Sequence, residues 1–208
     1  MRATRDLLRR RTPLARQRGA LLAHVHNTNS QYHLPAIGTK IAYKANRDGV
    51  AERFADPAVQ KSIAVDLALI GYDEALRRAV ELPIVKTAKH HDAQTLYLLQ
   101  TVPGIGKILS LVLLYEMHDI ARFPRVQDCA SSCRLVKCAR ESAGKRSGTS
   151  GSTIGNAHLK WAFSEAAVLC LRDNPAAQQL LSRFEKKHSK GKALTILAHK
   201  WARAVSSM

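Results

Sequence analysis

The residue types best suited to chemistry gather first in a short turn, Val102-Pro103-Gly104-Ile105-Gly106-Lys107. Gly104 and Gly106 permit tight backbone geometry that other residues avoid. The amides that open the following helix form a natural anion site, and Lys107 adds a positive charge for the same phosphate. The arrangement is typical of a helix-hairpin-helix that binds a nucleic-acid backbone without reading its bases. The alternative is an ordinary helix–helix turn in which glycine serves geometry alone.

A second candidate is a segment rich in serine, glycine and basic residues, from about residue 139 to 155. Its composition cannot bury itself and predicts a loop. The loop could be a platform for a nucleophile, a phosphate clamp or a plain linker, and composition alone favours the linker. Composition does not choose among four candidate serine nucleophiles, which are Ser142, Ser147, Ser150 and Ser152. Three neighbouring cations could stabilise a phosphoryl transition state, namely Arg140, Lys145 and Arg146.

The ligand-type residues predict no metal site. A two-metal nuclease needs converging carboxylates, whereas the acids here are scattered and read as helix caps or solvated positions. The cysteines lack a CxxC pair, so their spacing is only weak evidence for a zinc site. We interpret Cys129 and Cys133 as small buried hydrophobic residues. The pair His90-His91 has no ligand partner at useful spacing.

The charge of the chain points to a polyanionic partner. Among 208 residues, Lys and Arg number 33 against 16 acidic residues, a formal net charge of +17. Such an excess attracts nucleic acid through counterion release. An anionic membrane surface fits poorly, because the sequence has neither a long apolar run nor a sustained basic amphipathic stretch. We therefore expect a cytosolic, reduced compartment that contains nucleic acid.

The elements that would position these residues are helices, and we predict an all-α fold. Residues 1 to about 30 form a basic helix interrupted at Pro13, whose arginines face either solvent or phosphate. A connector from Asn27 ends at Asp56-Pro57, an N-cap followed by a first-turn proline, and Asn174-Pro175 is expected to open a later helix in the same way. Further helices are expected over residues 58–82 (ended by Pro83), 86–99, 108–117, 126–136, 156–172, 175–187 and 192–205. We expect two parts: residues 1–90, with the basic arm and a coiled-coil-like hairpin, and residues 91–208 around the turn.

An ordered set of motifs runs through the C-terminal part of the sequence: Leu99 to Lys107, Phe123-Pro124, Arg134-Leu135-Val136, Glu141-Ser142, Gly144-Lys145-Arg146 and Ile154 to Lys160. With these motifs, the C-terminal part resembles the transposase domain of the DEDD-type insertion-sequence transposases of the IS-one-ten group, IS-eleven-eleven-like and related to the Piv/MooV DNA invertases. The first part resembles the helical linker and coiled-coil region of the same enzymes. The resemblance implies a cytoplasmic, nucleoid-associated protein of a bacterium.

The resemblance implies a function and a choice among the serines. The family performs DNA transposition with a catalytic serine, and Ser142 matches that nucleophile by position. It implies DNA as partner, a guide RNA, and assembly as a homo-oligomer or with full-length transposase. The residues expected to bind nucleic acid on this basis are Gly104, Gly106, Lys107, Arg140, Lys145, Arg146, Asn156 and Lys160.

The resemblance also implies that Ser142 acts together with a second, metal-binding domain. The family joins this helical region to a RuvC-like domain that holds magnesium with four acids, and that domain is expected before Met1. We therefore expect a truncated transposase that binds no cofactor itself and is not catalytic alone. The alternatives are a non-catalytic helix-hairpin-helix module for DNA or RNA, or an inhibitor that assembles with intact transposase.

Overall fold

The chain is mainly helical, as predicted, and the computed structural model describes residues 1–136, 138–150 and 154–208. It divides into an N-terminal unit, Arg2–Lys86, and a C-terminal unit, Thr87–Met208. The long helix α2 (Pro57–Thr101) crosses this division, and its backbone leaves the helical region at Asp92. Among the described residues, no helix is both long and apolar enough to span a bilayer.

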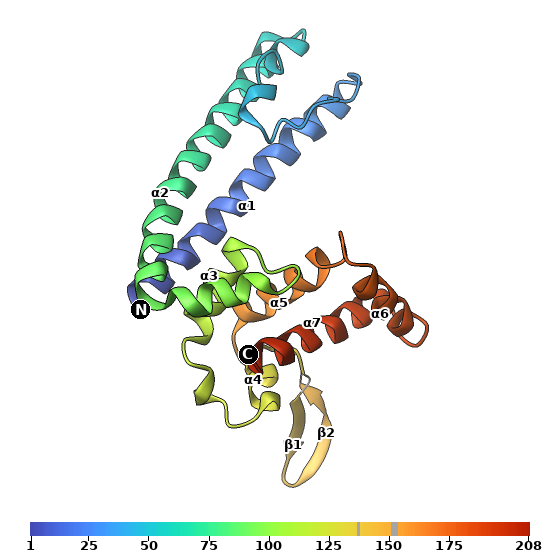
Figure 1. The fold of residues 1–208 in the computed structure, drawn as a ribbon. Helices are drawn as coiled ribbons and strands as arrows, with labels where there is room; N and C mark the ends of the chain where they lie inside the picture. Colours follow the sequence, from blue (N-terminus) through green and yellow to red (C-terminus); the bar gives the residue numbers. More distant parts are fainter. Residues whose placement is uncertain (137, 151–153) are drawn as a thin grey trace. The chain divides into compact units, whose positions relative to one another are not determined.

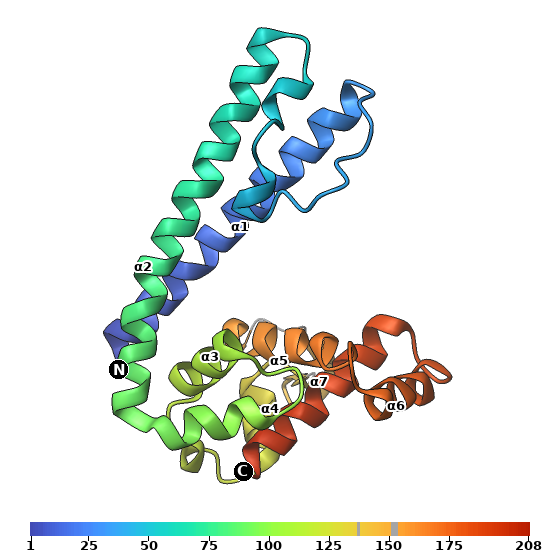
Figure 2. The ribbon, with the colours of Figure 1, turned by 45° about the horizontal axis from the view of Figure 1, so that its top comes forward.

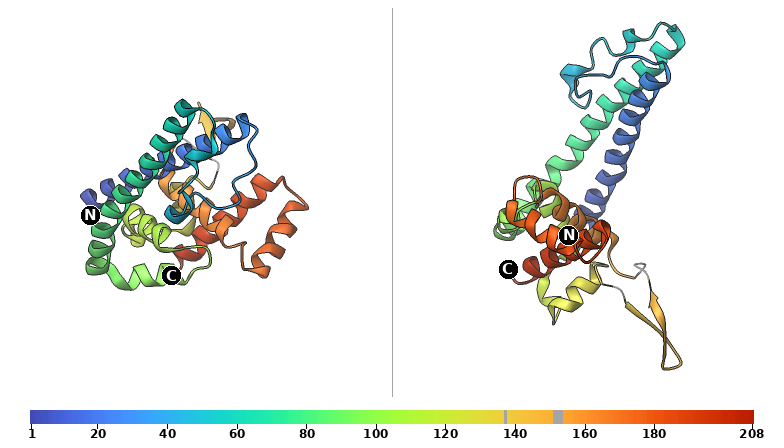
Figure 3. Two further views of the ribbon diagram at one scale, coloured as in Figure 1. Left: turned by 90° about the horizontal axis from the view of Figure 1, so that it is seen from above. Right: turned by 90° about the vertical axis from the view of Figure 1, so that its right-hand side faces the viewer.

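The N-terminal unit is built on two antiparallel helices, α1 (Arg2–Gln31) and the first part of α2, which lie side by side in Figures 1 and 3. Ion pairs define their register. Arg11 pairs with Glu81, and Arg18 lies 3.0 Å from Glu74. Because rising numbers in α1 meet falling numbers in α2, the helices run in opposite directions. The sequence analysis expected the arginines of the basic arm to face either solvent or phosphate. Arg11 and Arg18 instead face the partner helix α2.

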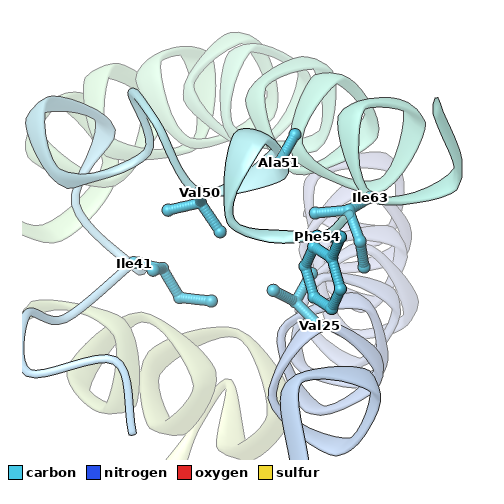
Figure 4. Packing of buried hydrophobic residues seen from close by; sticks show 6 residues of the cluster. All are labelled: Val25, Ile41, Val50, Ala51, Phe54 and Ile63. Carbon is cyan, nitrogen blue, oxygen red and sulfur yellow. The ribbon is translucent and has the colours of Figure 1, made fainter. Parts of the chain in front are cut away.

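The connector between α1 and α2 packs against the end of α1 and the start of α2. It contains two 3-10 turns, η1 (Lys44–Asn46) and η2 (Ala51–Arg53). Its apolar side chains join those of both helices in one core, drawn in Figure 4: Val25, Ile41, Val50, Ala51, Phe54 and Ile63. Asp56 caps α2 as predicted, because its carboxylate accepts from the amide of Ala58 at 2.7 Å.

Two prolines do not break helices where the sequence indicated. Pro13 lies inside α1 and Pro83 inside α2, so the predicted interruption and the predicted helix end are wrong. Both prolines are exposed, so water can bond the carbonyl that loses its helical partner. Burial of neighbouring residues such as Leu8 and Ile84 helps hold each helix together. The interruption of α2 falls at Asp92, whose carboxylate caps the segment that follows through the amide of Thr95.

Figure 2 shows the helices of the C-terminal unit. The buried core of this unit includes Leu111, Leu113, Leu159, Phe163 and Leu197. Helix α3 packs against α5, while α7 packs against α4, α5 and α6. The helices are α3 (Lys107–Met117), α4 (Val126–Ser132), α5 (Ala157–Leu169), α6 (Pro175–Glu185) and α7 (Lys190–Ser206), with the 3-10 turn η3 (Ile120–Arg122) after α3. The predicted cap of α6 is confirmed, since Asn174 accepts from the amide of Ala177 at 3.1 Å.

The serine-rich segment is not a plain loop. Strand β1 (Cys138–Ser142) pairs antiparallel with β2 (Lys145–Ser150), as Figure 1 shows. Ala143 and Gly144 form the two-residue connection, and both have positive φ, of 50° and 72°. That combination is typical of the type I′ turn, whose twist matches paired strands. The candidate Ser152 lies outside the described residues.

Candidate nucleic-acid interface

The turn between α2 and α3 (residues 102–106, the α2–α3 turn) is a tight hydrogen-bonded turn. The amide of Ile105 donates to the carbonyl of Val102 at 3.0 Å. Pro103 occupies the second position and Gly104 the third, with a φ of 86°. A positive φ at the third position after proline is typical of a type II turn, which favours glycine there. The sequence Pro-Gly therefore determines this local geometry.

Gly104 also serves packing. A β-carbon at this position would overlap the carbonyl oxygen of Ala166 and lie 2.7 Å from the backbone nitrogen of Cys170. The turn thus sits directly on the end of α5. For Gly104, the structure supports the interpretation that glycine serves the geometry of the turn.

Gly106 differs from Gly104, because a β-carbon there would meet nothing within 4 Å. Gly106 precedes α3 with a φ of −86° and provides no side-chain cap for its amides. The first amides of a helix have no partner within the helix and carry the positive end of its dipole. Gly106 and Lys107 are both exposed. The start of α3 therefore presents open backbone and one cation to an anionic ligand.

The other predicted cluster, at Asn156 and Lys160, lies at the opposite end of the α3–α5 pair. Gly104, before α3, contacts the end of α5, while Glu116, near the end of α3, bonds Asn156 at the start of α5. The two helices are therefore antiparallel. With a rise of about 1.5 Å per residue, the 11 residues of α3 separate the two clusters by roughly 16 Å. The predicted residues do not form one compact site.

The side chain of Asn156 is already engaged within the protein. Its oxygen accepts from the amides of His158 (2.8 Å) and Leu159 (3.2 Å), capping α5. Its nitrogen donates to the carboxylate of Glu116 at 2.6 Å. Glu116 is only 3% exposed, so this bond holds a buried charge. The structure thus gives Asn156 an architectural role, and its contact with nucleic acid stays a prediction.

Asn156 belongs to a set of bonds at the base of the β hairpin, which we call the clasp (Glu116, Ser132, Arg134, Gly155 and Asn156). The backbone amide of Asn156 donates to the carbonyl of Ser132 at 2.7 Å. The guanidinium of Arg134 donates to the carbonyl of Gly155, also at 2.7 Å. Gly155 has a φ of 106°, and a β-carbon there would lie 2.6 Å from the Ser132 carbonyl oxygen. The clasp therefore joins the chain before β1 to the chain after β2.

The hairpin itself carries the predicted nucleophile and three predicted cations. Ser142 ends β1 and stands opposite Lys145, while Glu141 stands opposite Arg146. Arg140 pairs with Gly148, so the register skips Ser147 and forms a bulge. Lys145 is exposed. The backbone register therefore brings Ser142 and two of the cations to the same end of the hairpin.

The sequence analysis assigned no role to Glu116, Arg134 or Trp201. Arg134 belongs to one of the motifs that carry the resemblance and has a positive φ of 56°. Its role in the clasp depends on Gly155, which lies 21 residues further along the chain. Glu116 sits in a nearly all-apolar helix, and an acid in such a run is a signal of burial with a partner. Trp201 donates from its indole nitrogen to the carbonyl of Pro103 at 2.9 Å.

Cys129, Cys133 and Cys170 are buried, as expected for Cys129 and Cys133, which are fully inaccessible. A hydrogen bond from Cys133 lowers the pKa of the Cys129 thiol to about 7. The same interaction, together with burial, raises the pKa of Cys133. Within the described ranges, no three His, Cys, Asp or Glu side chains gather closely enough to hold a metal ion.

The fold and site together define a basic helical protein whose exposed, uncapped helix start suits the binding of an anionic backbone. Residues 96–182 match the model of the Transposase IS116/IS110/IS902 family. The matched segment contains the α2–α3 turn, the clasp and the hairpin. The match supports the coarser part of the resemblance, namely the similarity of this segment to insertion-sequence transposases of the IS110 type.

One similar protein also belongs to an insertion element. An uncharacterized 43.6 kDa protein of insertion element IS110 from Streptomyces coelicolor is 28% identical over 119 residues. The similarity covers 57% of this chain and 28% of the relative's length. The chain thus corresponds to a minor part of that protein.

Proposed function

We propose that this chain is the helical part of an insertion-sequence transposase, which binds DNA and contributes Ser142 as the nucleophile of strand transfer. The observation that carries the proposal is the family match over residues 96–182, which encloses both the open start of α3 and the hairpin of Ser142. The partners we propose with it are DNA, a guide RNA, and further copies of this chain or of full-length transposase.

The α2–α3 turn would bind DNA through its backbone. A phosphate at the start of α3 would accept from the amides after Gly106 and pair with Lys107. Because these donors contact phosphate, binding would not depend on base sequence. Lys160 and the hairpin cations Arg140, Lys145 and Arg146 would add contacts elsewhere on the same DNA.

Ser142 would attack the DNA backbone. Its Oγ would form a bond to phosphorus while the bond from phosphorus to a sugar oxygen breaks. The serine proton would pass to solvent, and the departing sugar oxygen would take up a proton. The product would be DNA joined to Ser142 through a phosphodiester, with a free sugar hydroxyl. Lys145, opposite Ser142 in the register, would stabilise the charge that develops on the phosphoryl oxygens.

Magnesium has no site among the described side chains, so we assign no step of this chain to a metal. In the family that the sequence resembles, magnesium is held by the acids of a RuvC-like domain. We propose that Ser142 becomes reactive only in a composite site with such a domain. The chain alone would then bind DNA without turnover, and it would work in the cytoplasm of a bacterium.

The test of the nucleophile is complementation. A full-length IS110-type transposase whose own nucleophilic serine is changed to alanine is mixed with this chain, magnesium, its guide RNA and element-end DNA. We expect a covalent protein–DNA adduct on a denaturing gel with the natural chain and with Ser147→Ala, and none with Ser142→Ala. Adduct formation that survives Ser142→Ala, or no adduct with the natural chain, would reject Ser142 as the nucleophile.

A second candidate is a non-catalytic nucleic-acid-binding module, which the exposed, uncapped start of α3 favours because it can bind phosphate without any chemistry at Ser142. It predicts that the chain binds duplex DNA with strong salt dependence and that Ser142→Ala changes nothing in the assay above. A module that assembles with intact transposase would instead lower transposition when added to the active enzyme.

A further inference from the structure

The C-terminal unit has an open groove beside the α2–α3 turn. One wall is formed by the end of α2 and the turn, at Thr101 and Pro103, and the other by the last part of α7. Lys200, Trp201 and Arg203 line the α7 side, and Asn174 lies beside them. Apart from Asn174, these residues come from segments about one hundred positions apart in the chain. Only the tertiary structure therefore creates the groove.

Trp201 connects the two walls. Its indole nitrogen donates to the carbonyl of Pro103 at 2.9 Å, so α7 is attached to the turn itself. The carbonyl of Pro103 belongs to the same type II turn whose Gly104 packs on α5. Both walls of the groove are thus fixed to the rigid part of the unit, and its shape does not depend on a flexible loop.

The charge of the groove is positive and uncompensated. Lys200 and Arg203 are exposed, and neither forms an ion pair with any carboxylate that the structure describes. Burial lowers the pKa of the neighbouring His199, and the charges of Arg203 and Lys200 lower it further. Residues three apart on a helix point to the same side, so both cations reach one ligand surface.

The end of the chain adds charge of the same sign. From residue 174 to the C-terminus the only acid is Glu185, against seven lysines and arginines: Arg183, Lys186, Lys187, Lys190, Lys192, Lys200 and Arg203. Helix α7 lies beyond the segment that matches the transposase family. The α7 wall of the groove therefore lies outside the matched segment, while the α2–α3 turn and Asn174 lie inside it.

We propose that this groove binds the sugar–phosphate backbone of a nucleic-acid duplex, and that it extends the contact made at the start of α3. Phosphates would pair with Lys200 and Arg203, and the sugar between them would lie against the apolar rings of Pro103 and Trp201. The α2–α3 turn contributes to both proposed binding surfaces, because Pro103 lines the groove and Gly106 directly precedes α3. The proposal deepens the DNA binding proposed above by adding a second, independently testable contact.

The experiment measures the affinity of the full chain for a fluorescent duplex as a function of salt. The groove variant carries Lys200→Glu and Arg203→Glu. The matched control carries Lys61→Glu and Arg78→Glu, two exposed cations of α2 in the N-terminal unit with the same change of net charge. Because all four residues are exposed, we expect both variants to fold, and circular dichroism with thermal melting verifies this.

We expect the groove variant to bind about tenfold more weakly, with a salt slope smaller by about two, because each cation–phosphate contact contributes about 0.9 to the slope. The control should lose less than about threefold. An equal loss in both variants, or no loss in the groove variant, would overturn the proposal. Trp201→Phe, which keeps a ring but removes the bond to Pro103, should weaken binding with an unchanged slope, and an undiminished affinity would contradict the role of this bond.

Parallel titrations with duplex DNA and duplex RNA identify which of the two nucleic acids the groove binds. A loss with either duplex supports the groove and assigns its ligand, and a loss with both assigns the shared phosphodiester chemistry. Lys107→Glu separates this proposal from the proposed function. If Lys107→Glu weakens binding while the groove variant does not, the groove is rejected and the DNA-binding turn stands.

Discussion

Asn156 ties the start of α5 to the end of α3, because its side-chain amide donates to the buried carboxylate of Glu116 at 2.6 Å while its oxygen caps α5. One residue therefore completes a helix cap and satisfies a buried charge. It also follows Gly155, where the chain returns from the β hairpin. The position of the hairpin's base thus depends on a bond between two helices rather than on the hairpin itself.

The first prediction concerns this double role. Asn156→Ala should lower the free energy of unfolding by about 2–3 kcal/mol, because it removes a cap and one partner of a buried carboxylate. Asn174→Ala, which removes only the cap of α6, should cost about 1 kcal/mol. Urea unfolding of both variants measures the difference. Equal losses would show that the bond to Glu116 contributes nothing.

Asn156→Asp separates the two contributions further. Aspartate can still cap α5, but it cannot donate to Glu116 and places a second carboxylate beside it. We expect a loss close to that of Asn156→Ala at neutral pH, although aspartate is as good a cap as asparagine. Stability equal to that of the natural chain would assign the whole effect to capping.

The second prediction contrasts the two glycines of the α2–α3 turn. Gly104→Ala should destabilise the C-terminal unit by at least about 2 kcal/mol, because alanine is strained at a φ of 86° and its β-carbon overlaps α5. Gly106→Ala should cost at most about 1 kcal/mol, since space and backbone angles both allow it. Thermal melting compares the pair, and a similar shift in both would contradict the geometry described for the turn.

The third prediction is a pH dependence of the N-terminal unit. Burial alone would raise the pKa of Glu74, but hydrogen bonds and charges of Arg47 and Arg18 outweigh it and lower the pKa. A lowered folded-state pKa contributes stability above the pKa of the unfolded chain, and this contribution is lost as the pH falls through the folded value. Glu74→Gln should therefore destabilise the chain at neutral pH.

Unfolding at pH values from 7 down to 3 tests this dependence. The stability difference between the natural chain and Glu74→Gln should shrink as the pH falls, because protonated Glu74 resembles glutamine. Glu52→Gln, at an exposed position, changes the net charge equally and serves as the control. A difference that stays constant over the whole range would exclude Glu74 as the titrating group.

The fourth prediction concerns the hairpin turn. Ala143 has a φ of 50°, which costs energy for alanine but not for glycine. Ala143→Gly should therefore stabilise the hairpin by about 0.5–1 kcal/mol, and Gly144→Ala should destabilise it, because the φ there is 72°. Hydrogen exchange of the amides of β1 and β2 measures both changes. Slower exchange in Gly144→Ala would refute the turn type.

The sequence predicted the local features that depend on neighbouring residues. The caps at Asp56 and Asn174, each followed by proline, came from residue type and order alone. The apolar run of α3 predicted a buried helix, and Pro-Gly at 103–104 predicted a tight turn. The hairpin was missed because its strands contain serine, glycine and charge rather than alternating apolar residues, so their pairing depends on the turn and on the clasp at its base.

By itself, then, the sequence determined a basic helical chain, its caps, its glycine turn and its similarity to a transposase family, because these depend on composition and on short-range order. Tertiary structure alone decided what the individual residues do. It carried both helices through Pro13 and Pro83, because burial of their apolar faces outweighs one lost hydrogen bond. It also turned Asn156 inward to Glu116 and brought Trp201 to Pro103, since contacts between distant segments are set by how the helices pack.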